Sequence, residues 1–149
     1  MNLSDNLLKP SGHIKVDIFR HGELIEQMDG QNLVVVGYRQ ILAKLMGGAT
    51  TADWAITQIG VGTSAVAPVL GNTTLTGAFL KDVDTITYPS AQKVSFNFSL
   101  GTGDANGINI SEFGLLSGNG TLFARKVRGA PLVKDSSISL TGYWVITFS

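Results

Sequence analysis

Along most of the chain, apolar and polar residues alternate with a period of two, the pattern of β-strands that bury one face. Ile14, Val16 and Ile18 begin this pattern, and a turn at residues 20–23 leads into LIEQM, so we predict a hairpin near the start. Further strands are predicted at ITQIGV, VDTITY, KVSFNFSL, INISEFGLLS, TLFARKV and SISLTGYWVITF, with VDTITY beside KVSFNFSL. In the last segment, Trp144 is in phase with apolar residues, and we expect it in the core. Because turn signals separate these segments, the pattern predicts a mainly β fold, an antiparallel β-sandwich.

One segment, NLVVVGYRQILAKLMGG, has helical spacing instead. Four apolar residues fall on one helical face: Tyr38, Ile41, Leu42 and Leu45. The glycine pair at 47–48 is typical of a helix end. We therefore predict one amphipathic α-helix at residues 36–46, whose apolar face closes one end or edge of the sheet. The predicted organisation is a single domain at residues 12–149, preceded by an N-terminal arm at residues 1–11.

The arm, MNLSDNLLKPS, has three apolar side chains, Leu3, Leu7 and Leu8, outside the predicted domain. We expect these leucines to dock on a partner, and a frayed terminus is the alternative. A second candidate for partner contact is Trp54, which follows a loop rich in Gly and Thr. We expect an exposed indole there, which anchors a partner or stacks on a sugar.

The stretch IGVGTSAVAP matches a dinucleotide-binding pattern through Gly60, Gly62 and Ala65, and Asp82 and Asp84 follow further along the chain. That pattern binds pyrophosphate only where its third position opens a helix, whose N–H groups hold the phosphates. Here the next residues are VAPVLGNTTLTG, a poor helix sequence, and no parallel strand is predicted after them. We therefore interpret the match as a loop and expect no binding of NAD, FAD or ATP.

Composition excludes several classes of function. Lys plus Arg and Asp plus Glu number 11 each, so no net field attracts nucleic acid or an anionic membrane. The basic cluster Arg125, Lys126 and Arg128 lacks an aromatic stacking platform, and we expect no nucleic-acid binding. Without cysteine there is neither a disulfide nor a thiolate site. We see no secretory signal and no apolar run long enough for a membrane span, and we expect synthesis in a reducing cytosol.

Catalytic and metal-binding patterns are weak. His13 and His21 flank one strand and are too far apart to bind one metal ion. Glu112 interrupts an apolar strand, and general-acid chemistry there needs a second carboxylate, for which Asp104 is the candidate. We favour a structural role, in which Glu112 accepts backbone hydrogen bonds or pairs with Arg125. We therefore expect a protein that is not an enzyme and has no cofactor and no metal ion.

From residue 31 to 148, the order of segments resembles a β-rich domain of tailed-bacteriophage structural proteins, found in tail-fibre, baseplate and collar proteins. The segments that carry the resemblance are NLVVVGYRQILAKLMGG, IGVGTSAVAP, KVSFNFSL, ANGINISEFGLL, GTLFARKV and LTGYWVITF. The resemblance implies a virion building block, assembled in the host cytoplasm, with other virion proteins as partners. A capsid decoration or head-fibre anchor is the alternative within the virion. A carbohydrate-binding module for host-surface glycans, built around Trp54, is the alternative from another class.

A low content of charged residues, 15%, suggests that much of the surface contacts other protein. The strands VSFNFSL and YWVITF carry no charge, and uncharged edge strands invite pairing with another chain. We therefore expect a symmetric homo-oligomer, a trimer or a hexamer.

Overall fold

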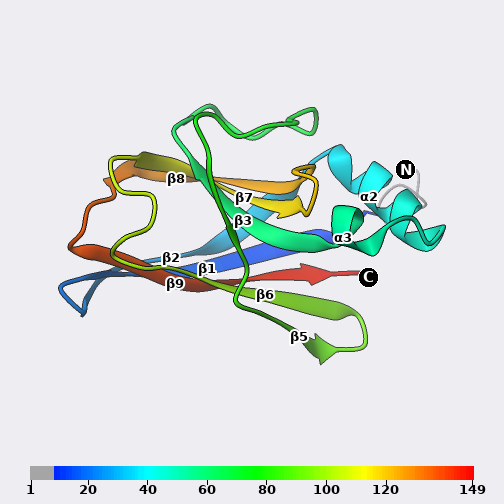
Figure 1. Ribbon diagram of the computed structural model, residues 1–149, viewed down its shortest axis with the longest axis horizontal. Helices are drawn as coiled ribbons and strands as arrows, with labels where there is room; N and C mark the ends of the chain where they lie inside the picture. Colours follow the sequence, from blue (N-terminus) through cyan, green and yellow to red (C-terminus); the bar gives the residue numbers. More distant parts are fainter. Residues whose placement is uncertain (1–8) are drawn as a thin grey trace.

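The computed structural model describes residues 9–149, which form nine strands and two short helices. The strands are β1 (Ser11–Arg20), β2 (Glu23–Val34), β3 (Ile56–Gly62), β4 (Phe79–Asp82), β5 (Thr85–Ser90), β6 (Lys93–Leu100), β7 (Asn109–Ser117), β8 (Leu122–Val133) and β9 (Ile138–Thr147). The helices, α2 (Gly37–Met46) and α3 (Thr51–Trp54), lie between β2 and β3 (Figure 1). The prediction of a mainly β protein is confirmed.

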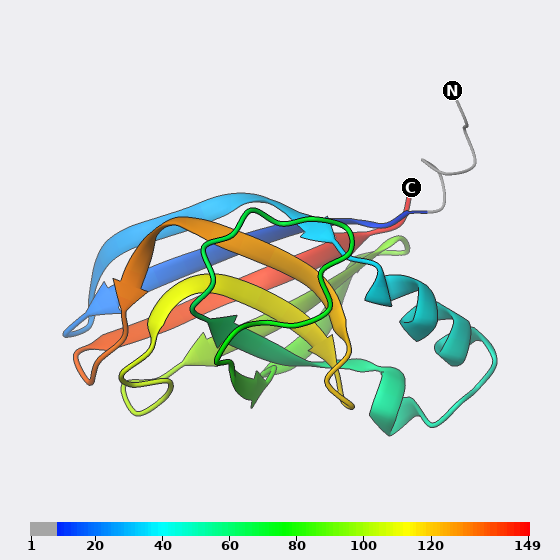
Figure 2. The ribbon, with the colours of Figure 1, turned by 90° about the horizontal axis from the view of Figure 1, so that it is seen from above.

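All nine strands belong to one antiparallel sheet, in the order β4-β3-β7-β8-β2-β1-β9-β6-β5. The sheet curls into a half-barrel, as Figure 2 shows from above. The predicted sandwich is not confirmed, because β2 joins the two halves of the sheet by hydrogen bonds. Within residues 12–32, β2 pairs with β1 as a hairpin. At the end of β2, Leu33 and Val34 pair instead with Arg125 and Ala124 of β8. A period-two pattern fixes which side chains face inward, but it does not fix whether the strands form two sheets or one curled sheet.

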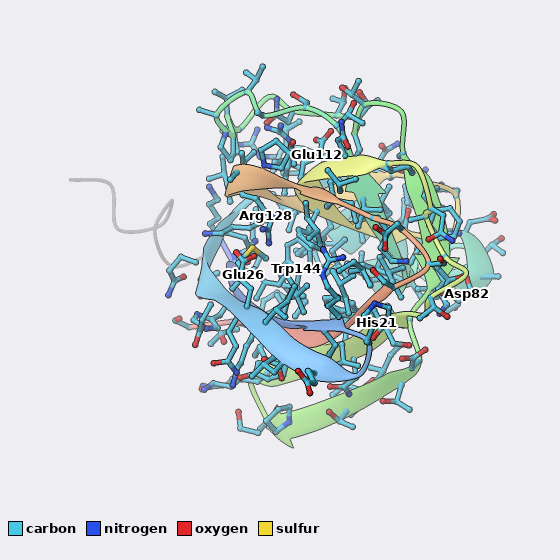
Figure 3. The ribbon with its side chains drawn as sticks, turned by 90° about the vertical axis from the view of Figure 1, so that its left-hand side faces the viewer. His21, Glu26, Asp82, Glu112, Arg128 and Trp144 are labelled. Carbon is cyan, nitrogen blue, oxygen red and sulfur yellow. The ribbon has the colours of Figure 1, made fainter. Side chains whose placement is uncertain are left out.

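The core fills the concave side of the curled sheet. Trp144 of β9 is fully buried there, as predicted, and Figure 3 shows it in the middle of the molecule. Its indole N–H donates to the side-chain oxygen of Asn32 on β2, at 2.8 Å. Ile14, Val16 and Ile18 of β1 are also fully buried, in agreement with their alternation in the sequence.

Helix α2 coincides with the predicted helix and packs at one end of the half-barrel (Figure 1). It buries Ile41 completely, and the ring of Tyr38 meets Phe123 of β8 edge-on at a centroid distance of 6.5 Å. The second helix, α3, was not predicted. It has only four residues, too few to show a helical period, and its first turn depends on the carbonyl of Thr50, which accepts the N–H groups of Asp53 and Trp54.

Residues 63–78 form a long connection, here called the strap, which runs over the convex side of β7 and β8 (Figure 2). The strap contains no helix, as expected from its sequence, but Gly60 and Gly62 of the glycine pattern lie in β3 and not in a loop as predicted. A Cβ atom on Gly60 would lie 2.7 Å from Leu75 of the strap. A Cβ atom on Gly62 would lie 2.6 Å from the Glu112 carboxylate and 2.7 Å from the Thr76 carbonyl oxygen. The two glycines of β3 therefore make room for the strap and for Glu112.

The free edges of the sheet are β4 and β5. The uncharged segments VSFNFSL and YWVITF are not edge strands, because β6 and β9, which contain them, are each paired on both sides. The link between β4 and β5 crosses from one half of the sheet to the other. Val83 N–H donates to Thr57 of β3, and Asp84 N–H donates to Asn97 of β6. This link holds the two edges near each other at one place.

Candidate interaction surface

The end of the half-barrel that carries α2 has an apolar groove of about 200 Å³, here called the mouth groove. One wall is the α2 face made by Ile41, Leu42 and Leu45. The opposite wall is the concave side of β5, β6 and β9 and comprises Ile86, Tyr88, Val94, Phe96, Ile146 and Phe148. All the described residues that line the groove are apolar or aromatic, and none carries a charge. The groove is therefore suited to apolar side chains.

The rim of the mouth groove exposes a cluster of large apolar side chains. Tyr88 is 76% exposed and Met46, at the end of α2, is 90% exposed. Ile86, Leu45 and Phe148 are exposed by a little over a third. Single exposed apolar residues are normal on a protein surface, but a contiguous group beside a groove is typical of an interaction site.

The outer edge of β5 borders the same surface, and all six of its residues are exposed. Its pairing with β6 is regular from Thr85 to Thr87 and irregular before Ser90. Pro89 lies in the irregular part and supplies no N–H group, a common means of preventing edge-to-edge pairing. The groove, rather than backbone pairing along β5, is therefore the feature of this end that best fits a partner.

Glu112 and Arg125 form a buried ion pair beneath the strap. Arg125 Nε donates to one carboxylate oxygen of Glu112 at 2.8 Å, and the two side chains are at most 3% exposed. The other carboxylate oxygen accepts the N–H groups of Ser64 and Thr76, both at 2.9 Å. The guanidinium group also donates to the side-chain oxygen of Asn72 at 3.1 Å. Both parts of the predicted structural role of Glu112 are confirmed, and the cluster fixes both ends of the strap.

Asp104 has different partners from Glu112. Its carboxylate accepts hydrogen bonds from the Lys81 ammonium at 2.9 Å and from the N–H of Gly101 at 2.8 Å. These bonds hold the pKa of Asp104 below its ordinary value. Nearby, Lys134 is fully buried and donates to Asn106 Oδ1 at 2.9 Å and to the Asp135 carbonyl oxygen at 3.1 Å. Burial lowers the pKa of the Lys134 ammonium group.

The remaining charged candidates lie apart from one another. His13 contacts Asp29 on the neighbouring strand, whereas His21 lies in the β1–β2 turn. Within residues 9–149, no group of three His, Asp or Glu side chains is arranged to hold a metal ion. The basic cluster is divided: Arg125 lies under the strap, and Lys126 Nζ donates to the Gln31 carbonyl oxygen at 2.8 Å.

Arg128, the third member of the basic cluster, meets Glu26 across the gap where β2 and β8 separate (Figure 3). Its guanidinium group lies 3.1 Å from the Glu26 carboxylate and is itself almost buried. A pocket of about 400 Å³ lies between the two strands at this point. Acidic and basic side chains line it together, so the pocket has no field of a single sign.

The predicted contact residues have different positions. Leu3, Leu7 and Leu8 lie outside the described residues. Trp54 ends α3, and the prediction of an exposed indole is wrong, because the side chain is partly buried against the core. The Lys44 ammonium lies 5.8 Å from the centre of its ring. The mouth groove itself was not predicted, because it forms between α2 and strands that are far from α2 in the sequence. The predicted strand VDTITY and the apolar face of the predicted helix were its signals in the sequence.

No helix among residues 9–149 is long and apolar enough to cross a membrane. No protein-family model, no curated protein and no solved structure matches the chain.

Proposed function

We propose that the chain is a non-enzymatic structural protein of a bacteriophage virion, a tail component that acts by protein–protein assembly. The observation that carries the proposal is the mouth groove, whose lining is uncharged and whose rim exposes Tyr88, Met46 and Phe148. A surface of this kind loses water-exposed apolar area when a partner covers it, which favours association. The resemblance of residues 31–148 to phage tail-fibre, baseplate and collar domains supports the virion setting.

The charged groups also fit a structural role. Glu112 and Arg125 form an ion pair that holds the strap, and Asp104 forms an ion pair with Lys81. An acid–base pair for hydrolysis needs two carboxylates that face a common cleft. The partners of Glu112 and Asp104 instead give each carboxylate a stabilising contact of its own. The half-buried position of Trp54 gives glycan binding less support than the groove gives to protein assembly.

The test is the location of the chain in purified phage particles. Particles of the phage that encodes this sequence are purified and separated into tails and capsids. The chain is then identified in each fraction by mass spectrometry. Electron microscopy of particles labelled with an antibody then gives its position. We expect the chain in the tail fraction. Recovery with capsids alone would support a decoration or head-fibre anchor instead, and absence from particles would contradict the proposal.

A further inference from the structure

The mouth groove has a candidate occupant within this chain, and the inference rests on the proposed role in assembly. We propose that the groove of each copy binds residues 1–8 of the predicted N-terminal arm of a neighbouring copy, so that an exchange of these segments joins the subunits. The argument uses the chemistry of the groove, the place where the arm joins the domain, and the length of the arm.

The chemistry of the arm matches that of the groove. Residues 1–8, MNLSDNLL, include Leu3, Leu7 and Leu8, and the one acidic residue is Asp5. The groove wall offers only apolar and aromatic side chains, such as Leu45, and its opening is bordered by exposed apolar groups. A charged side chain such as Asp5 would lose hydration inside the groove without gaining an ionic partner. Leucine side chains lose only unfavourable contact with water there, so the proposal places the leucines in the groove and leaves Asp5 outside it.

The arm joins the domain at the end that carries the groove. Ser11, the first residue of β1, pairs with Thr147 of β9, and the next residue of that chain end, Phe148, lines the groove. Figure 2 shows the start of β1 beside the end of β9, at the end of the half-barrel where α2 lies. The start of the domain, where the arm is attached, and the mouth groove therefore lie at the same end of each subunit. Subunits that meet at this end around a symmetry axis bring each arm close to the groove of the next copy.

The length of the arm is sufficient for such an exchange. Eight residues in extended conformation span roughly 26 Å, at about 3.3 Å per residue. That reach exceeds the width of several neighbouring strands, which lie roughly 4.8 Å apart. A stable interface needs roughly 1,200–2,000 Å² of buried surface in total. Arms exchanged around a closed ring add their buried area to that of the opposed rims, where Tyr88 and Met46 are exposed.

Disulfide trapping tests this exchange directly, because the natural sequence contains no cysteine. One chain carries both Asn6→Cys in the arm and Tyr88→Cys at the groove rim, which leaves all three arm leucines in place. The control chain carries Asn6→Cys with Glu23→Cys, because Glu23 is exposed at the start of β2, directly after the β1–β2 turn. After mild oxidation, denaturing gels without reductant resolve disulfide-linked species. We expect the test chain to form a ladder of linked subunits that ends at the copy number of the ring, and the control chain to remain almost entirely monomeric.

Two other results would overturn the inference. A disulfide that forms only within single chains would show that each arm occupies its own groove. Cross-linking no stronger than in the control would show that the arm does not bind at the groove.

A second measurement uses variants without cysteine. Leu3→Ser, Leu7→Ser and Leu8→Ser are combined in one chain, and Asn2→Ser with Asn6→Ser is the matched control. Sedimentation should show loss of the oligomer in the leucine variant alone, and an unchanged oligomer in that variant would contradict the inference. These experiments use purified protein, so their failure is distinct from failure of the virion proposal. If the chain is found in phage tails but its disulfides form only within single chains, the proposed function stands and the inference is wrong.

Discussion

Replacing Glu112 with Gln tests whether the buried ion pair fixes the strap. One carboxylate oxygen of Glu112 accepts a hydrogen bond from Arg125, and the other accepts the N–H groups of Ser64 and Thr76. Glutamine has one acceptor oxygen, so its amide NH₂ must face either the guanidinium group or the two N–H donors. In either orientation, donors oppose donors and the Arg125 charge stays buried without its counter-charge. Breaking a buried pair in this way costs about 3–5 kcal/mol.

Urea unfolding measures this loss. With a urea slope of about 2 kcal/mol/M, a loss of 3–5 kcal/mol lowers the midpoint by about 1.5–2.5 M. Glu26→Gln is the matched control, because Glu26 also pairs with an arginine but is 49% exposed. We expect the control to lose about 1 kcal/mol or less, as for exposed pairs. Limited proteolysis should cut the Glu112→Gln variant within residues 63–78 sooner than wild type. A midpoint for Glu112→Gln no lower than that of Glu26→Gln would refute the reasoning.

Three further predictions concern stability. Asp104→Asn should destabilise the protein by about 1 kcal/mol or less at pH 7. Because its folded-state pKa is lowered, the difference from wild type in urea unfolding should shrink as the pH falls below 3.8 and Asp104 becomes protonated. The pKa of Lys134 is lowered in the folded state, so the free energy of unfolding of wild type relative to Lys134→Met should rise as the pH approaches 10.5. A difference between the two proteins that does not change with pH would contradict this. Gly62→Ala should lower the free energy of unfolding by about 1–3 kcal/mol through overpacking. Gly71→Ala, where a Cβ meets no atom within 4 Å, should leave thermal unfolding nearly unchanged.

Much of the secondary structure was predictable because each element has its own period. The alternation at Ile14, Val16 and Ile18 located β1, and helical spacing located α2 within one residue of its start. Element β4 was missed because it has four residues and follows the strap directly. The single curled sheet was not predictable, since it depends on two residue pairs between β2 and β8.

The candidate interaction surface was less predictable than the fold. The role of Glu112 followed from its position, because a carboxylate inside an apolar strand needs partners when it is buried. The mouth groove depends instead on tertiary packing, which places α2 opposite β5 and β6, segments separated in the sequence by the strap and by β3 and β4. Similarly, the uncharged segments VSFNFSL and YWVITF lie in β6 and β9, which are interior strands, so a lack of charge did not identify the edges of the sheet.

The central claim is that the mouth groove is an assembly surface of a virion protein. Ile86→Asp tests it most directly, because Ile86 lines the groove and is 41% exposed, so a charge there blocks apolar contact at modest cost to folding. Thr87→Asp, on the same exposed strand but outside the groove lining, is the matched control. Each variant is supplied during phage growth, and its amount in purified particles is measured by mass spectrometry against wild type. The account predicts that the Thr87→Asp chain enters particles and that the Ile86→Asp chain, folded as shown by circular dichroism, stays in the soluble fraction. Equal incorporation of the Ile86→Asp chain and wild type would contradict it.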